Sequence, residues 1–306
     1  MDKFSADLSD DVIENLRTKC KNESVRMSSP ELEKVLYKLI PVLDHGFVRV
    51  IDYMGTDASI VQAARVSYGI GTKKTQEDKG LINYLMRHGH STPFEMCELK
   101  LHVKLPIFVM RQWVRHRTAN INEYSARYSV LSNEFYLPEI DQIARQSEVN
   151  RQGKADDAFF DQAQAQEILD IIGSVHNDAY EKYSHLLNNK SLARELARTV
   201  LPVGIYTEMY WKIDLHNLLH FLKLRTNSHA QYEIRHYANI ISDIVKKWVP
   251  YTYDAFVNYR QESVSVPRHC VDLINRALGG EKISQENSRL SKGEWQEFTK
   301  IFPIDK

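Results

Sequence analysis

Cysteine is scarce in this chain, and there is no net charge. Its 306 residues include three cysteines, Cys20, Cys97 and Cys270, which are widely separated and form no Cys-x-x-Cys pair. This pattern excludes the disulfide scaffold of a small secreted protein, and we expect a reducing cytoplasmic environment. Forty Lys and Arg residues balance forty Asp and Glu residues, so no global field attracts nucleic acid or an anionic membrane. Any preference for anions must be local.

Long apolar runs are also missing. The first residues, MDKFSADLSDD, are acidic and lack the apolar core of a signal peptide. No window approaches the ~20 consecutive apolar residues that a membrane span requires, so we expect a soluble protein. Hydrophobic residues make up 43% of the chain, which is enough for a substantial core in one or two domains.

Strand and helix patterns are mixed along the chain. Residues 47–54 are rich in β-formers, and residues 98–105 alternate polar and apolar side chains, as a strand with one buried face does. Regular βαβ alternation and a Gly-x-Gly-x-x-Gly fingerprint are absent, so a Rossmann fold is not indicated. Helical patterns are expected at residues 31–40, 57–68, 76–88, 107–117, 158–188, between Ser191 and Pro202, and twice between 206 and 248.

Local signals mark several element ends. Ser29 precedes a proline at the first helical position and is expected to cap a helix, and Ser191 is expected to cap another. Gly89 can follow a helix end, and Thr92-Pro93-Phe94-Glu95 matches a capping box. Residues 141–157 are polar and indicate a loop.

The strongest local feature is a cationic stretch. Between Arg111 and Arg127 there are four arginines and one glutamate, so this window carries about +3 while the whole chain carries zero. The planar fork of arginine pairs with phosphate in a bidentate manner, which makes phosphate the natural ligand. The plainer alternative is a solvated or salt-bridged helix face.

Ser125 lies at the end of this stretch, in a segment with the loop-forming residues Asn120 and Asn122. Backbone N–H groups in such a loop can bind an anion. A nucleophilic serine would need a base and an orienting carboxylate, for which His116 and Glu123 are the nearby candidates. Anion binding is the interpretation that we prefer.

The run Arg115-His116-Arg117, followed after seven residues by Ser125, resembles the signature of the flavin-dependent thymidylate synthases, the ThyX family. The resemblance implies a catalytic domain at 46–260 between two extensions, 1–45 and 261–306. It also implies the α+β class, a ThyX-like domain with antiparallel strands flanked by long helices. Further matching stretches are AARVSY at 63–68, RHGHSTPFE at 87–95, PIFVMRQW at 106–113, ELARTVLP at 195–202 and LRTNSHAQYEI at 224–234.

What the resemblance implies for chemistry is reductive methylation of dUMP to dTMP. Methylenetetrahydrofolate gives the carbon, and FAD reduced by NADPH gives the hydride. Arg225 matches the catalytic arginine beside the uracil, where a fixed cation favours ionisation of the ring nitrogen between the carbonyls. The matching dUMP positions are Gln112, Arg115, Glu123, Ser125, Ala126, Arg127, Arg198 and Arg225. The matching flavin positions are Ser67, His90, Thr92, Arg115, His116, Arg117, Glu123, Asp214, His216 and His220.

The resemblance also implies a homotetramer whose active sites combine residues of several subunits. Two departures from the family pattern are visible. Asn120 stands where a serine is frequent, and Asp214, His216 and His220 stand where Asn or Arg is frequent. Because Asp214 adds negative charge near an anionic cofactor, it puts the adenine end of the flavin site in doubt.

Parts of the sequence are also compatible with other functions. An RNA-binding module would use the arginines on the backbone and stack bases on Tyr124 and Tyr128, but the neutral charge balance argues against nucleic acid. A metal-dependent phosphohydrolase would need carboxylate and histidine ligands, and the chain has no His-Asp dipeptide. His216 and His220 could bind zinc by spacing, as could His88 and His90, but no third ligand is obvious, so no metal is expected.

A flavin-free thymidylate synthase would need an activated cysteine to attack the uracil. Cys97 begins an alternating strand pattern and Cys270 lies in the polar C-terminal part, and neither belongs to a motif for that task. We therefore expect chemistry without a protein nucleophile.

Overall fold

The computed structural model describes residues 25–66, 78–147 and 153–303. The chain forms two compact units, with the boundary after Gln261. Within the described residues, no helix combines the length and the apolar character needed to cross a membrane.

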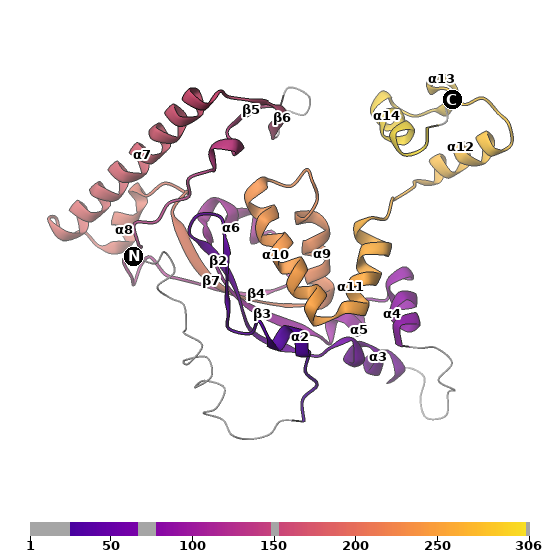
Figure 1. Cartoon of the computed structure of the whole chain (residues 1–306), viewed down its shortest axis with the longest axis horizontal. Helices are drawn as coiled ribbons and strands as arrows, with labels where there is room; N and C mark the ends of the chain where they lie inside the picture. The colour runs from indigo at the N-terminus through magenta and orange to yellow at the C-terminus, as the bar shows by residue number, and fades with distance from the viewer. Residues whose placement is uncertain (1–24, 67–77, 148–152, 304–306) are drawn as a thin grey trace. The chain divides into compact units, whose positions relative to one another are not determined.

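The first unit is built on a five-stranded sheet in which every neighbouring pair is antiparallel (Figure 1). The central strand has four fully buried leucine and valine side chains that alternate with half-buried polar ones, so the strand predicted at 98–105 is confirmed, as is the α+β class. Across the sheet the strands are β1 (Leu39–Val42), β2 (Gly46–Met54), β3 (Glu98–Pro106), β7 (Tyr206–Asp214) and β4 (Asn120–Glu123).

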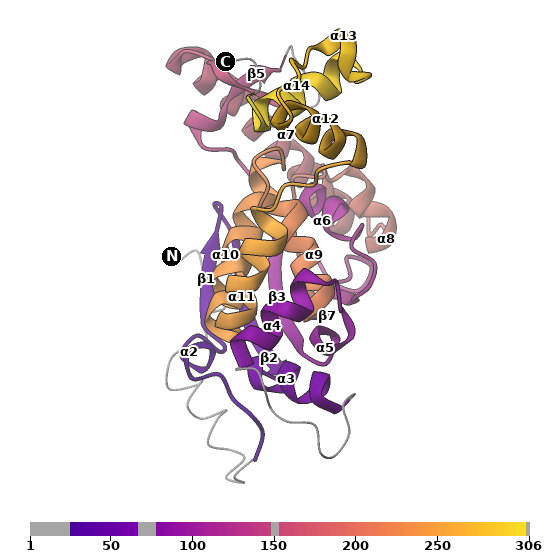
Figure 2. The same ribbon diagram turned by 90° about the vertical axis from the view of Figure 1, so that its right-hand side faces the viewer.

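Helices pack on the apolar face of this sheet and share its core (Figure 2). Three tryptophans, Trp113, Trp211 and Trp248, are among the largest fully buried side chains of this core. The helices of this part are α2 (Pro30–Glu33), α3 (Asp57–Val66), α4 (Asp78–Arg87), α5 (Thr92–Glu95), α6 (Ile107–Trp113), α9 (Leu215–Arg225), α10 (Tyr232–Trp248), α11 (Pro250–Phe256) and the π-helical turn η3 (Val257–Gln261).

A second group of elements, between residues 140 and 200, follows β4 in the chain. Its main element is the 27-residue helix α7, which begins four residues later than the predicted helix and is capped by the Asp161 carboxylate accepting from the Gln164 N–H at 2.9 Å. The predicted loop at 141–157 is wrong in part, because two of its segments pair as a hairpin. The elements are η1 (Ile140–Gln142), β5 (Ala144–Gln146), β6 (Lys154–Phe159), α7 (Gln162–Asn188), α8 (Arg194–Ala197) and η2 (Arg198–Val200).

The start of the predicted helical region at 206–248 is also wrong. Residues 206–214 form β7, in which Met209, Trp211 and Ile213 point into the core and alternate with more exposed side chains. Residues 206–214 alternate apolar and polar side chains in the sequence, but the helical spacing begins only with the residues that follow, from Leu215. The helix predicted at 31–40 likewise ends at Glu33, since residues 39–42 are needed as the edge strand β1.

Capping predictions had mixed outcomes. Gly89 adopts φ +71°, and the Gly89 and His90 N–H groups bond the Met86 and Leu85 carbonyls at 3.3 and 3.0 Å, a Schellman motif that ends α4 as predicted. Ser191 does not cap a helix, since α8 begins after Ala193. Neither Ser29 nor the residue before Thr92 makes a side-chain cap; Ser29 instead donates its hydroxyl to the Lys247 carbonyl at 2.9 Å.

The second unit is a small helical body at the C-terminus. It contains α12 (Arg268–Leu278), α13 (Gln285–Ser288) and α14 (Lys292–Ile301). Its own core consists of Cys270, Leu273, Ile283, Leu290 and Phe298. The polar composition beyond Gln261 therefore reflects a unit with little interior, as is usual for so few residues.

Candidate functional site

The centre of the candidate site is Arg225, at the C-terminal end of α9. Its Nε–H donates to the Nε2 atom of His116 at 3.0 Å, and its Nη2 donates to the Gln112 carbonyl at 3.3 Å. These contacts join two segments that are more than 100 residues apart in sequence. The side chain is half-buried, and burial lowers the pKa of Arg225 below its usual value. Arginine remains a cation all the same, because its reference pKa exceeds 12.

His116 is a neutral base in this arrangement. Burial lowers the pKa of His116 to about 4, and the nearby Arg225 and His220 add to the effect. An imidazole that accepts a hydrogen bond at Nε2 carries its proton on Nδ1. His116 is therefore an acceptor for the guanidinium and adds no charge of its own at neutral pH.

The cationic stretch is largely free of carboxylates. Of its four arginines, only Arg127 is recorded in an ion pair in the described parts of the chain. Arg111, Arg115 and Arg117 are exposed and pair with no carboxylate there. Of the plainer alternative, a solvated or salt-bridged helix face, the salt-bridged form therefore does not apply to Arg111, Arg115 and Arg117, and the paired Arg127 lies in a turn after β4 and not on a helix.

A second group of predicted site residues gathers around α8. Arg127 meets Glu195 at 3.0 Å, and Arg194 donates to the Tyr128 carbonyl. Ser125 forms a turn in which its Oγ accepts the Arg127 N–H at 3.3 Å. Arg198 is exposed one turn further along. Within the described residues, no hydrogen bond or ion pair links this group to Arg225.

A cavity of about 210 Å³ brings together three histidines that the sequence placed in one site. His90 follows the end of α4, and His216 and His220 lie one turn apart on α9. Apolar side chains form the rest of the wall, and Lys223 and Arg260 add cationic groups. Such a donor set suits a ligand with a flat apolar ring and acidic groups. The cavity is smaller than the roughly 300–1,000 Å³ of typical ligand sites, so it can hold only part of a large ligand.

Lys223 and Arg260 were not singled out from the sequence. A signal existed for Lys223, which lies three residues after His220 and therefore on the same face of α9. Nothing comparable marked Arg260, which reaches the site because η3 brings it to the end of α4, where it donates to the Met86 carbonyl at 3.0 Å.

Asp214 has a structural task. Its carboxylate caps α9, accepting from the Asn217 backbone N–H at 2.9 Å and from the Asn217 side chain at 2.8 Å. Two donors and the positive end of the helix dipole offset its charge. Of the other predicted flavin residues, Thr92 begins α5 and is exposed, and Ser67 lies outside the described residues.

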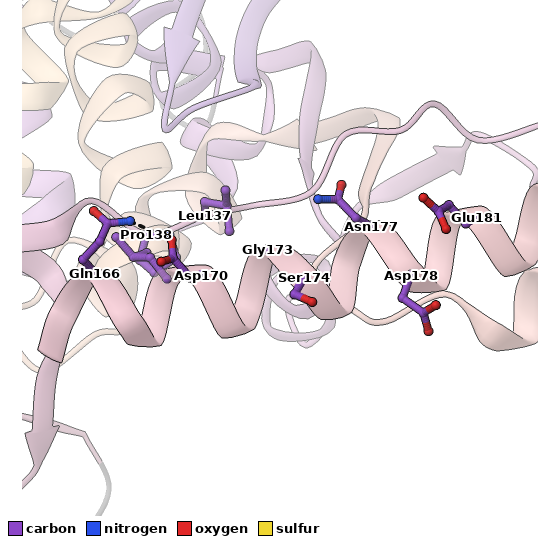
Figure 3. Close-up of a pocket in the computed structure, with 10 residues that line it drawn as sticks. Leu137, Pro138, Gln166, Asp170, Gly173, Ser174, Asn177, Asp178 and Glu181 are labelled. Carbon is purple, nitrogen blue, oxygen red and sulfur yellow. Dashed lines mark hydrogen bonds between the residues drawn. The ribbon is translucent and has the colours of Figure 1, made fainter. Parts of the chain in front are cut away.

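A larger hollow, about 680 Å³, lies along α7 (Figure 3). Its walls are residues of α7 together with Leu137 and Pro138, and no predicted site residue is among them. Asp170, Asp178 and Glu181 make it acidic, which disfavours a phosphate ligand. The smaller, histidine-lined cavity instead carries the cationic groups Lys223 and Arg260 and three of the predicted flavin residues.

Nucleophilic alternatives find no support in the geometry. Glu123 accepts from the Thr207 hydroxyl at 3.0 Å and His116 accepts from Arg225, and in the described chain no hydrogen bond joins either side chain to Ser125. Cys97 is fully buried, and burial raises the pKa of its thiol to about 12. No group of three or more potential metal ligands is found in the described part of the chain.

Comparison with known proteins places this chain in a family. The family described as thymidylate synthase complementing protein matches residues 49–251. A flavin-dependent thymidylate synthase of Rickettsia bellii is 54% identical over 291 residues, which cover 92% of this chain and 99% of that protein. One of Wolbachia pipientis wMel is 56% identical over 271 residues, covering 89% of this chain and 94% of that protein. These alignments are longer than the 46–259 region of the sequence motifs and include part of the flanks.

Solved structures show a similar fold. A UMP/dUMP methylase, PolB, from Streptomyces cacaoi bound with 5-Br UMP has a TM-score of 0.64 and 34% identity, covering 72% of this chain and 98% of that one. The same protein bound with 5-Br dUMP also gives a TM-score of 0.64, at 33% identity. The likeness thus extends over almost the whole of the compared chain and leaves over a quarter of this one unmatched.

Proposed function

Because the chain belongs to the thymidylate synthase complementing proteins, the family of the flavin-dependent thymidylate synthases, we propose that it converts dUMP to dTMP by reductive methylation at carbon 5. The observation that carries the proposal is the junction at Arg225, where a half-buried guanidinium is held between two family motifs. Arg111, Arg115 and Arg117 lie close in sequence to Gln112 and His116, are exposed, and pair with no carboxylate in the described chain. A nucleotide offers the phosphate that such arginines bind.

The nucleotide phosphate needs several cationic donors. We place it between arginines of the Arg115 segment and those of the α8 group, because guanidinium forks suit a phosphate dianion. In the turn at Ser125, the N–H groups of Arg127, Tyr128 and Ser129 bond oxygens of Ser125, and those of Ser125 and Ala126, which make no hydrogen bond within the described chain, can serve the same purpose. The full set proposed for dUMP is Gln112, Arg115, Glu123, Ser125, Ala126, Arg127, Arg198 and Arg225.

Arg225 is proposed to act on the uracil ring. A fixed cation beside the ring nitrogen between the two carbonyls stabilises the ring anion, and the negative charge is shared with carbon 5. Carbon 5 then becomes nucleophilic without a covalent bond to the protein. Partial burial strengthens this interaction, since it lowers the local dielectric constant.

The cofactor is a flavin, and we propose FAD. The histidine-lined cavity fits one part of such a ligand, since apolar walls suit the ring and Lys223 suits a phosphate. Bound FAD, reduced by NADPH, would supply the hydride, and methylenetetrahydrofolate would supply the carbon. The proposed flavin contacts are Ser67, His90, Thr92, Arg115, His116, Arg117, Glu123, Asp214, His216 and His220.

We also propose a homotetramer with shared active sites. The two groups of dUMP residues, around Arg225 and around α8, share no hydrogen bond or ion pair within the described chain, as expected if neighbouring copies complete each site. Helix α7 supports the same view, because only Ala165 and Tyr183 of its 27 residues are buried, while Ile171 and Val175 are exposed by more than half. A helix of this kind needs a partner for its apolar residues.

Absorption spectroscopy of the purified protein tests the proposal. We expect the flavin bands of a yellow protein, bleaching by NADPH, and dTMP formation when dUMP and methylenetetrahydrofolate are added. Light scattering on the same sample should give four times the chain mass. A colourless protein that binds RNA would overturn the flavin assignment, and a yellow protein that leaves dUMP unmethylated would overturn the substrate.

A further inference from the structure

His116 is held firmly between α6 and α9. Its backbone N–H donates to the Trp113 carbonyl at 3.0 Å, which closes the turn after α6. The imidazole packs edge-on against Phe221, with ring centroids 4.9 Å apart, and lies 6.1 Å from the ring of His220. In this orientation Nε2 of the ring faces Arg225.

The bond between His116 and Arg225 has a defined chemistry. Arg225 donates through Nε at 3.0 Å, so Nε2 of His116 must carry a lone pair. The Gln112 carbonyl accepts from Nη2 on the same edge of the guanidinium. Two acceptors on one edge fix the plane of the fork and leave Nη1 without a hydrogen bond to the described chain. The low pKa of His116 agrees with this, since a charged imidazole would repel the arginine.

We propose that His116 is a positioning residue for Arg225, whose Nε2 lone pair holds the guanidinium with its terminal edge ready for the uracil. The inference rests on the catalytic role proposed for Arg225. An unrestrained Arg225 side chain would lose rotamer freedom each time it bound the uracil ring. A side chain that His116 and Gln112 already hold has lost that freedom before the substrate binds. The family resemblance implies a flavin contact for this histidine, and the bond to Arg225 is a separate task.

Two amide variants at position 116 test the proposal. In His116→Gln the amide oxygen reaches the place of Nε2 and can accept from Arg225. In His116→Asn the same amide is one bond shorter and ends at the level of Nδ1, which makes it a matched control. With FAD added in excess, we expect kcat of the Asn variant to be about 10- to 100-fold below that of the Gln variant, the usual effect of losing a hydrogen bond to a charged group. Both variants replace a proposed flavin contact, so FAD affinity should change to a similar extent in the two, and KM for dUMP should differ little between them.

Arg225→Ala completes the experiment. In that background His116→Asn should cause no further loss of kcat, because there is no guanidinium left to position. Equal kcat values for the Asn and Gln variants at saturating FAD, or an additive loss in the double variant, would overturn the positioning role. Full turnover of Arg225→Ala alone would instead overturn the proposed role of Arg225, whatever the His116 variants do.

Discussion

The carboxylate of Glu195 lies 3.0 Å from both Nε and Nη2 of Arg127, so one edge of that guanidinium is occupied by a neighbour from α8. Both side chains are about half exposed, and an exposed pair of this kind contributes at most about 1 kcal/mol to the free energy of unfolding. The pair therefore matters for the orientation of Arg127, because a phosphate can bind to the guanidinium edge that Glu195 leaves free.

We predict that Glu195→Gln raises KM for dUMP by about 3- to 10-fold with little change in kcat, since a neutral amide holds the arginine less firmly. Steady-state kinetics at low and moderate salt checks this. Glu181→Gln, a change on α7 outside the proposed site, should leave KM as it was. A lower KM in Glu195→Gln would mean that the glutamate competes with the phosphate.

Arg225→Ala should largely abolish turnover but leave a measurable residual rate. Removing a fixed cation from a developing anion costs about 100-fold or more in kcat. Release of tritium from carbon 5 of labelled dUMP should fall in parallel with dTMP formation, while the flavin stays bound. Tritium release at the normal rate would show that another group activates the ring.

The stability of the fold should depend on the neutral form of His116. Its pKa falls from 6.5 to about 4 on folding, so the unfolded chain takes up the proton more readily. Above about pH 6.5 this contribution is fully present, and it is lost as the pH falls towards 4. Urea unfolding of wild type and His116→Gln at pH 7 and pH 5 checks this, and the Gln variant should lose less stability between the two.

Substitutions of Asp214 can separate its role as the cap of α9 from the effect of its negative charge on cofactor binding. Asp214→Asn keeps an oxygen acceptor for the Asn217 N–H and should leave the free energy of unfolding nearly unchanged, whereas Asp214→Ala should lower it by about 1 kcal/mol. If the carboxylate does face an anionic cofactor, Asp214→Asn should bind FAD more tightly. Chemical unfolding and flavin titration of the same two variants measure both effects.

Cys97→Ala should retain turnover. The thiol is fully buried with a pKa near 12, so it is not ionised at neutral pH. Loss of a buried side chain should still lower the melting temperature by a few degrees. Initial rates with excess dUMP check the first point, and an inactive but folded variant would favour attack by a cysteine.

Much of the site was readable from the sequence. Strict alternation at 98–105 predicted β3, and Gly89 predicted the end of α4, because both signals are set by side chains adjacent in the chain. The arginine-rich motif likewise indicated a phosphate ligand from residue type alone. His90, His216 and His220 were assigned to one site by resemblance, and they line one cavity.

Strand and hydrogen-bonding partners that are distant in sequence could be identified only from the tertiary structure. Helical spacing around 31–40 is a local preference, and it is overridden where β1 pairs with β2. The bond between His116 and Arg225, the pair of Arg127 with Glu195, and the use of Asp214 as a cap all depend on where α6, α8 and α9 come to lie. Sequence by itself determined which groups were available for chemistry. Only packing decided which hydrogen-bonding partner each one met, because burial and distance are properties of the folded chain.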